Sequence, residues 1–206
     1  MTNKDYLKDI SEIKSIMNKS SRFISLSGLS GIIAGIYALI GAFLANYIIV
    51  GYQSSGTTIS LLPISYLEYL LVGIALLVLI LSTLTAFIFS SKKAKKSGEK
   101  LWDATTKRLL INFSIPLLTG GLFSIILYQY GLIGLIAPTT LIFYGLACVN
   151  ASKYTLGDIR YLGLLNISIG LIATQFIGYG LYFWALGFGI LHIIYGTLLY
   201  NKYDKK

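Results

Sequence analysis

Long runs of apolar residues, separated by short polar segments, make up most of this sequence from residue 23 onward. Six runs come close to or exceed the roughly 20 residues that a helix needs to cross a bilayer. They are too long, and lack the strict alternation, to be strands of a membrane barrel. We therefore predict an all-α polytopic membrane protein with six transmembrane helices, whose approximate bounds are 23–50, 67–90, 109–129, 132–150, 162–178 and 181–200.

Glycine-containing turns separate the runs that follow one another most closely. Tyr130-Gly131 divides the third run from the fourth, and Gly178-Tyr179-Gly180 divides the fifth from the sixth. We therefore predict that the six-helix bundle is arranged as three hairpins. The second and third hairpins share short motifs at 112–115 (Asn-Phe-Ser-Ile) and 166–169 (Asn-Ile-Ser-Ile), which leaves both an internal duplication and chance recurrence open.

The ends of the chain are polar. In residues 1–22, Tyr6, Ile10, Ile13 and Met17 share one face at helical spacing, which predicts a cytoplasmic amphipathic helix. Its opposite face mixes lysines with acidic residues, whereas a helix lying on anionic lipid is more purely basic. This favours a cytoplasmic protein partner or a homo-oligomer, and docking on the protein's own inner loops is the alternative. Residues 201–206 are predicted to form a cytoplasmic tail.

Lysine and arginine determine the predicted orientation. Of the 17 basic residues, five precede the first run, seven lie between the second and third, two lie between the fourth and fifth, and three end the chain. All of them fall on the same predicted side. The positive-inside rule then predicts a multi-pass protein of a bacterial inner (plasma) membrane with both termini in the cytoplasm. Because topology explains the net charge of +9, we do not expect nucleic acid as a partner.

The first run carries a pattern of small residues. Ser27, Gly31 and Gly35 recur every four residues and therefore lie on one face of the predicted helix. Small residues at this spacing let two helices approach closely in lipid. We predict that this face packs against another span.

Polar side chains gather in the cytoplasmic half of the predicted bundle. His192 is the only histidine of the chain and the most central ionisable group in any predicted span. Polar groups at such depth face the bundle interior and mark candidate sites. We predict a polar cavity open to the cytoplasm, and a histidine that is merely hydrogen-bonded within the packing is the alternative. The candidate cavity residues are His192, Tyr195, Asn112, Asn166, Ser168 and Tyr144.

Other chemistry is sparse in the sequence. Glu68 is the only acidic residue on the predicted outer side, which makes it a candidate outer acidic site. The single cysteine, Cys148, has no partner for an internal disulfide, and no cluster of cysteines and histidines has the spacing of a metal site. We therefore predict no catalytic residue, cofactor or metal.

Three short motifs carry a resemblance to other membrane proteins. Residues 141–145 (Leu-Ile-Phe-Tyr-Gly) and 151–154 (Ala-Ser-Lys-Tyr) resemble an uncharacterised class of small six-span bacterial inner-membrane proteins. The resemblance extends over most of the chain and implies a fold without an activity. Residues 28–31 (Gly-Leu-Ser-Gly) resemble the nucleophile motif of rhomboid intramembrane proteases, whose catalytic histidine, like His192, lies in the last span. The serine of that family belongs to the fourth span, whereas Ser30 lies in the first.

Three classes of function are left open by these features. The bare outer face, the basic inner face and residues 1–22 favour a non-enzymatic membrane module that binds a cytoplasmic or membrane partner as scaffold, sensor or regulatory subunit. The similar hairpins, the prolines within spans, Glu68 and His192 favour the alternative of a small-solute transporter or channel. An intramembrane hydrolase that uses Ser30 and His192 is the remote third hypothesis.

Overall fold

A computed structural model describes residues 26–54, 56, 58–98 and 102–205, and every regular element in these residues is helical. The predicted amphipathic helix of residues 1–22 lies outside the described residues. The long helices before the last turn are α2 (Gly28–Gln53), α3 (Ile64–Lys96), α4 (Ala104–Gln129), α5 (Ile136–Ala151) and α6 (Ile159–Ala173). Single 3₁₀ turns, η1 (Ile59–Leu61) and η2 (Ile133–Leu135), precede α3 and α5.

The last helical run, Gly180–Asp204, is called the C-terminal helix below. It is continuous but changes its winding along its length. Its segments are α7 (Gly180–Trp184), the π-helical η3 (Ala185–Ile190), α8 (Leu191–Leu199) and the π-helical η4 (Tyr200–Asp204).

Five of the described helices are long and apolar enough to cross a membrane, which confirms the prediction of an all-helical, multi-pass membrane protein. They are α2, α3, α4, Ile133–Ala151 and the C-terminal helix. The helix at the fifth predicted span, α6, is apolar but has 15 residues. At 1.5 Å per residue it measures about 22 Å, which is shorter than a hydrocarbon core of about 30 Å. The predicted span of 162–178 is shortened because the helix ends at Ala173 and the chain turns at Gly178, where φ is +101°.

The glycine turn between α4 and α5 agrees with its prediction. Gly131 has a φ of +71°, a conformation that favours glycine. The amide of Leu132 donates to the Leu127 oxygen at 2.8 Å, and that of Gly131 donates to the Tyr128 oxygen at 3.0 Å. This pair of bonds closes the end of α4 with a glycine in the left-handed position.

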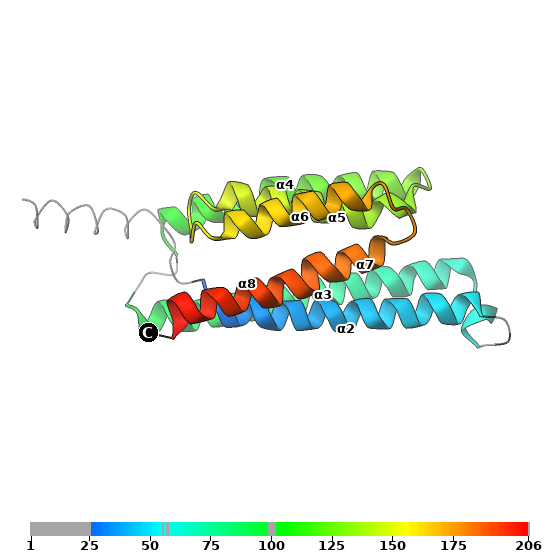
Figure 1. Cartoon of the computed structure of the whole chain (residues 1–206), viewed down its shortest axis with the longest axis horizontal. Coiled ribbons are helices and arrows are strands. Elements are labelled where there is room, and N and C mark those ends of the chain that lie inside the picture. The colour runs from blue at the N-terminus through cyan, green and yellow to red at the C-terminus, as the bar shows by residue number, and fades with distance from the viewer. Residues whose placement is uncertain (1–25, 55, 57, 99–101, 206) are drawn as a thin grey trace, which may run out of the picture.

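The helices lie in two groups (Figure 1). The first helix group contains α2, α3 and the C-terminal helix, which packs along α2. The second helix group contains α4, α5 and α6, with α5 packed on both of the others. In each of the first two predicted hairpins, the two helices therefore pack against one another. The two helices of the third predicted hairpin lie apart, because α6 packs chiefly on α5 while the C-terminal helix packs chiefly on α2.

Glycines set the close contact inside the first helix group. A Cβ atom on Gly28 would lie 2.3 Å from the Tyr200 nitrogen, and one on Gly35 would lie 2.7 Å from the Gly189 oxygen. At Gly31, which faces Gly196, the nearest atom would lie at 3.2 Å. The packing face predicted from Ser27, Gly31 and Gly35 thus lies against the C-terminal helix, where backbones approach too closely for larger side chains.

Glycines also set close contacts inside the second helix group. A Cβ atom on Gly145 of α5 would lie 2.5 Å from the Gly163 oxygen of α6, and one on Gly163 would lie 2.6 Å from the Gly145 oxygen. Between α4 and α5, the space beside Gly120 is filled by the ring of Phe143. Each group is therefore held by contacts between backbones and small residues.

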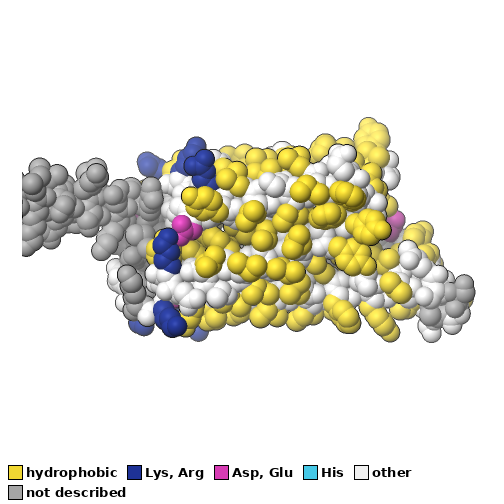
Figure 2. Space-filling model, in the orientation of Figure 1, with side chains coloured by type: hydrophobic (Ala, Val, Ile, Leu, Met, Phe, Trp, Pro, Cys, Tyr) yellow, Lys and Arg dark blue, Asp and Glu magenta, His cyan; other side chains and the backbone are white. Residues whose placement is uncertain are grey.

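Basic side chains gather at one end of the bundle on the face that Figure 2 shows. Hydrogen bonds join several helix ends there. Lys93, near the end of α3, donates to the Leu26 oxygen at 2.9 Å and pairs with Asp204 at the end of the C-terminal helix. Lys202 pairs with Asp158, just before α6, at 2.8 Å. We call this the basic end of the bundle.

One helix that starts at the basic end has a side-chain cap. Asp103 precedes α4, and its Oδ1 atom accepts from the Thr106 amide at 2.7 Å. Although partial burial acts to raise it, the hydrogen bonds from Thr106 and Thr105 lower the pKa of Asp103 below its usual value. The carboxylate therefore stays charged at neutral pH and satisfies amides that the first helical turn leaves unpaired.

Candidate functional site

The central polar contact of the bundle joins Tyr144 of α5 to His192 of the C-terminal helix. The Tyr144 hydroxyl lies 2.7 Å from Nε2 of His192, and Nδ1 of the same ring lies 2.9 Å from the Gly187 oxygen. Because a carbonyl oxygen only accepts, the proton resides on Nδ1. In the neutral ring, Nε2 then accepts a hydrogen bond from the Tyr144 hydroxyl. Both ring nitrogens of this buried histidine are therefore used within the protein.

Aromatic rings surround this pair. Phe188 stacks on His192 with ring centroids 5.9 Å apart, and its centroid lies 5.0 Å from that of Tyr144. Phe113 of α4 meets Tyr144 edge-on at 6.1 Å. Such offset and edge-on contacts are the favoured arrangements of aromatic pairs. They fix the orientation of both polar side chains, so that the site is preorganised.

The π-helical segment η3 brings Gly187 to the site. Segments of π-helix insert an extra residue into a helix and often occur at functional positions. A Cβ atom on Gly187 would lie 2.4 Å from the end of the Leu141 side chain and 2.6 Å from Oδ1 of Asn166, so that a larger residue there would require these side chains to shift. Asn166 of α6 is wholly buried, and its Nδ2 atom donates to the Leu162 oxygen at 3.0 Å. Its Oδ1 atom has no hydrogen-bond partner among the described residues.

The six predicted cavity residues divide into separate contacts. The structure brings Tyr144 and His192 together and places Asn166 against Gly187 beside them. The hydroxyl of Tyr195 is buried without a hydrogen-bond partner in the described part of the chain. Ser168 is exposed and donates to the Leu164 oxygen of its own helix. The sixth residue, Asn112, belongs to a different contact.

Asn112 and Asn150 compensate for a proline within α4. Pro116 lacks an N–H group, and it therefore leaves the carbonyl of Asn112, four residues earlier, without its helical hydrogen bond. Nδ2 of Asn150 in α5 donates to that carbonyl at 2.9 Å and lies 3.3 Å from Oδ1 of Asn112. The sequence carried a signal for this contact, since a proline in a span requires a replacement donor.

Glu68, the candidate outer acidic site, also has a partner. Its Oε2 atom accepts from the Tyr128 hydroxyl at 2.6 Å. This bond joins the beginning of α3 to the end of α4, at the end of the bundle opposite the basic end. The sequence alone does not indicate Tyr128 as this partner, because apolar patterns do not reveal which helices face one another.

Three polar contacts therefore link the two helix groups at three levels. Glu68–Tyr128 lies at one end and Tyr144–His192 in the middle. At the basic end, Asp158 accepts from Lys202 at 2.8 Å and from the Tyr203 hydroxyl at 3.1 Å.

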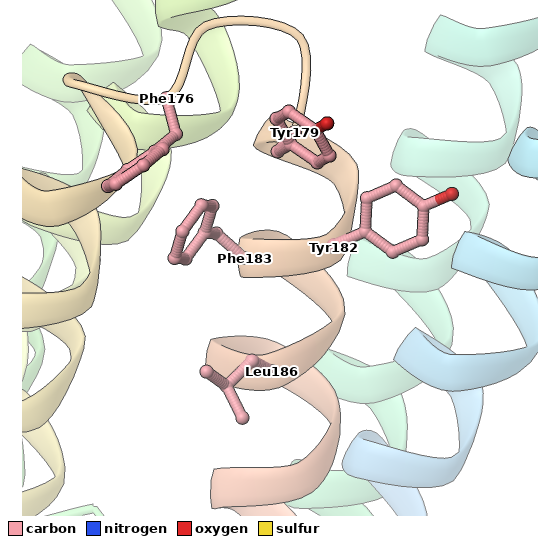
Figure 3. Close-up of a pocket in the computed structure, with 5 residues that line it drawn as sticks. All are labelled: Phe176, Tyr179, Tyr182, Phe183 and Leu186. Carbon is pink, nitrogen blue, oxygen red and sulfur yellow. The ribbon is translucent and has the colours of Figure 1, made fainter.

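An aromatic pocket opens between the groups near the turn that follows α6 (Figure 3). Its volume is about 440 Å³, and its lining residues are Phe176, Tyr179, Tyr182, Phe183 and Leu186. The rings of Phe176 and Phe183 face one another across it with centroids 6.1 Å apart. The lining is largely apolar and holds no acidic or basic side chain.

The geometry does not support the hydrolase hypothesis. Ser30 is buried and its hydroxyl donates to the Ser27 oxygen at 2.7 Å, while His192 is bonded to Tyr144 and Gly187. A serine nucleophile needs a histidine within hydrogen-bonding reach. The described residues also contain no group of three or more acidic, cysteine or histidine side chains that could hold a metal ion.

Comparison with known proteins adds no relative: no family model matches the chain, and no curated protein or solved structure matches it. The described part of the chain is all-helical, and its apolar helices are suited to crossing a membrane several times.

Proposed function

We propose that this protein is a non-enzymatic membrane module that binds a cytoplasmic or membrane partner as scaffold, sensor or regulatory subunit. The observation that carries the proposal is the contrast between packing within the two helix groups and packing between them. Within each group glycines bring backbone against backbone, whereas between the groups the glycine contact at Gly187 is with side chains, and three polar contacts among the described residues join the two groups. Because lipid is as apolar as the helix surfaces, such polar contacts, worth roughly 0.6 kcal/mol each on average, help to determine how the groups associate. A partner that binds one group can thereby change its position relative to the other.

The proposal includes six spans, with the basic end in the cytoplasm of a bacterial cell. With a crossing at α6 the number of spans is even, so that the chain ends on the side where its first span begins. This agrees with the ion pair between Lys93 and Asp204, which links the ends of α3 and the C-terminal helix at the basic end. The positive-inside rule then assigns this end to the cytoplasm.

Cysteine labelling tests this topology. After replacement of Cys148 by alanine, a cysteine introduced at Gly56 should react with an impermeant maleimide added to intact cells. A cysteine at Ser97 should react only after the membrane is opened. Reaction of Ser97→Cys, but not of Gly56→Cys, in intact cells would reverse the proposed orientation.

Residues 1–22 are the proposed partner-binding segment, because the mixed charge of their polar face suits a protein more than a lipid surface. Deletion of residues 1–18 should spare membrane insertion and abolish co-purification of a partner that crosslinks to the full-length chain in cells. The matched control is a segment of the same composition in which the apolar stripe is scrambled, which should also lose the partner. Identical partner profiles for all three chains would refute the proposal.

A small-solute transporter or channel is the second candidate. It is favoured by two of the five buried side-chain polar atoms that have no partner among the described residues, Oδ1 of Asn166 and the hydroxyl oxygen of Tyr195. Buried polar atoms in native proteins nearly always have one, and water or a solute can supply it. Proton flux into proteoliposomes, followed with a pH-sensitive dye, separates the candidates. Flux that is present in the wild type and absent in His192→Phe would favour the transporter.

A further inference from the structure

The acidic side chains that the structure describes at the basic end are used inside the protein. Asp103 caps α4, and Asp158 accepts from Lys202 and Tyr203. Asp204 accepts from Lys93 and, at 2.8 Å, from the Gly28 amide. All three of these acidic residues are partly buried.

The cations of the same end point outward. Six of them lie at helix ends, are exposed, and form no ion pair with an acidic side chain of the described residues. We call them the basic surface: Lys92, Lys95, Lys96, Lys107, Arg108 and Arg160. Basic side chains gather at this end of the bundle on the face seen in Figure 2.

The basic surface borders the apolar surface of the helices. Arg108 is followed directly by the apolar run of α4, and Arg160 is the second residue of the apolar helix α6. Beside them, the rings of Trp102 and Tyr161 are 63% and 67% exposed. Exposed aromatic rings next to apolar helices are typical of the membrane–water interface. Here the cations can reach phosphate groups without leaving the helix ends.

We propose that the basic surface binds the phosphate groups of anionic phospholipids in the adjoining leaflet. Charge complementarity supports this occupant, because unpaired cations at helix ends attract anionic headgroups. A lipid fits better than a soluble polyanion, since the cations border the apolar surface of three helices and interfacial aromatics accompany them. The inference rests on membrane embedding and does not depend on the partner-binding function, which uses residues 1–22.

Spin-labelled lipids test the proposal on the full-length protein in bilayers. Electron spin resonance should show that labelled phosphatidylglycerol is restricted by the protein severalfold more than labelled phosphatidylcholine. The preference should fall as salt is raised, because salt screens exposed charges. The triple variant Lys95→Gln, Lys96→Gln, Lys107→Gln removes half of the cations of the basic surface and should clearly weaken the preference, whereas the same positions changed to arginine should retain it in full.

Other outcomes would overturn the proposal. These are equal restriction of the two lipids by the wild type, a preference that salt does not reduce, or a preference that the glutamine variant retains in full. Capture of a soluble acidic polypeptide without lipid preference would also overturn it and point to a protein ligand instead. The salt series uses the wild type alone and therefore decides the question even if the glutamine variant does not fold.

Discussion

Lys93 and Asp204 form an ion pair between positions that are 111 residues apart, with Nζ 2.5 Å from Oδ1. The other carboxylate oxygen of Asp204 accepts from the Gly28 amide at 2.8 Å and from the Ser27 hydroxyl at 3.2 Å. Ser27 stands at the cap position of α2 but makes no capping bond of its own. Asp204 therefore supplies the cap from the other end of the chain, and its charge suits the positive end of the helix dipole.

This arrangement predicts that Asp204→Ala destabilises the first helix group. The substitution removes the cap of α2 and leaves the half-buried ammonium group of Lys93 without its anion. We expect a loss of roughly 1 kcal/mol or more in unfolding free energy, the usual effect of a lost helix cap. Thermal unfolding in detergent measures it. Lys205→Ala is the control, since Lys205 is the next residue in the chain and its exposed side chain forms no ion pair with a described residue. Equal melting temperatures for the two variants would contradict the prediction.

The glycine contacts predict a difference between two identical substitutions. In Gly196→Ala the new methyl group would lie 2.5 Å from the backbone nitrogen of Ile32, which cannot move without shifting α2. In Gly121→Ala it would meet nothing within 4 Å. Overpacking of this kind usually costs about 1–3 kcal/mol. We expect Gly196→Ala to lower the melting temperature and Gly121→Ala to leave it unchanged or slightly raised. A similar decrease in both variants would argue against close packing at Gly196.

The contact between Asn150 and Asn112 predicts coupling to Pro116. Asn150→Ala should destabilise the protein because the Asn112 carbonyl loses its only replacement donor. In a Pro116→Ala background the restored amide can bond that carbonyl within α4, so that Asn150→Ala should cost less. Unfolding free energies of the two single variants and the double variant give the coupling directly. Additive effects would show that Asn150 does not act through the carbonyl that Pro116 frees.

Much of the fold could be predicted because apolar length and turn chemistry are local. The runs of 109–129 and 132–150 and the turn at Gly131 agree with α4, α5 and the glycine that separates them. The short length of α6 was missed because the apolar pattern continues through the turn residues after Ala173. The pairing of helices was missed for a physical reason. A glycine or polar stripe shows which face of a helix packs, but does not identify the helix that it meets.

The same limit applies to the site. Depth alone singled out both Tyr144 and His192, since polar groups within spans avoid lipid. Their contact depends on the crossing of α5 with the C-terminal helix and on the π-helical segment that carries Gly187. The cap that Asp204 provides for α2 spans 176 residues and has no local signature.

The last prediction concerns the hydrogen bond between Tyr144 and His192 and its effect on the two helix groups. Tyr144→Phe removes the hydroxyl that lies 2.7 Å from Nε2 and leaves the Nδ1 bond to Gly187 in place. Polar contacts between membrane helices are worth roughly 0.6 kcal/mol on average, so the fold should survive. We expect ring ¹⁵N spectra of the single histidine to show a neutral ring protonated on Nδ1 in the wild type.

The position of the groups should respond to the same change, because this bond is their central polar link. Spin labels on α3 and α4 should give a broader distance distribution in Tyr144→Phe than in the wild type. Tyr195→Phe is the matched control, since it removes a buried hydroxyl of the C-terminal helix that has no partner among the described residues. It should leave the distribution unchanged. A wild-type ring protonated on Nε2 would contradict the assigned direction of the hydrogen bond, and equal distributions in all three proteins would show that Tyr144 and His192 do not hold the groups together.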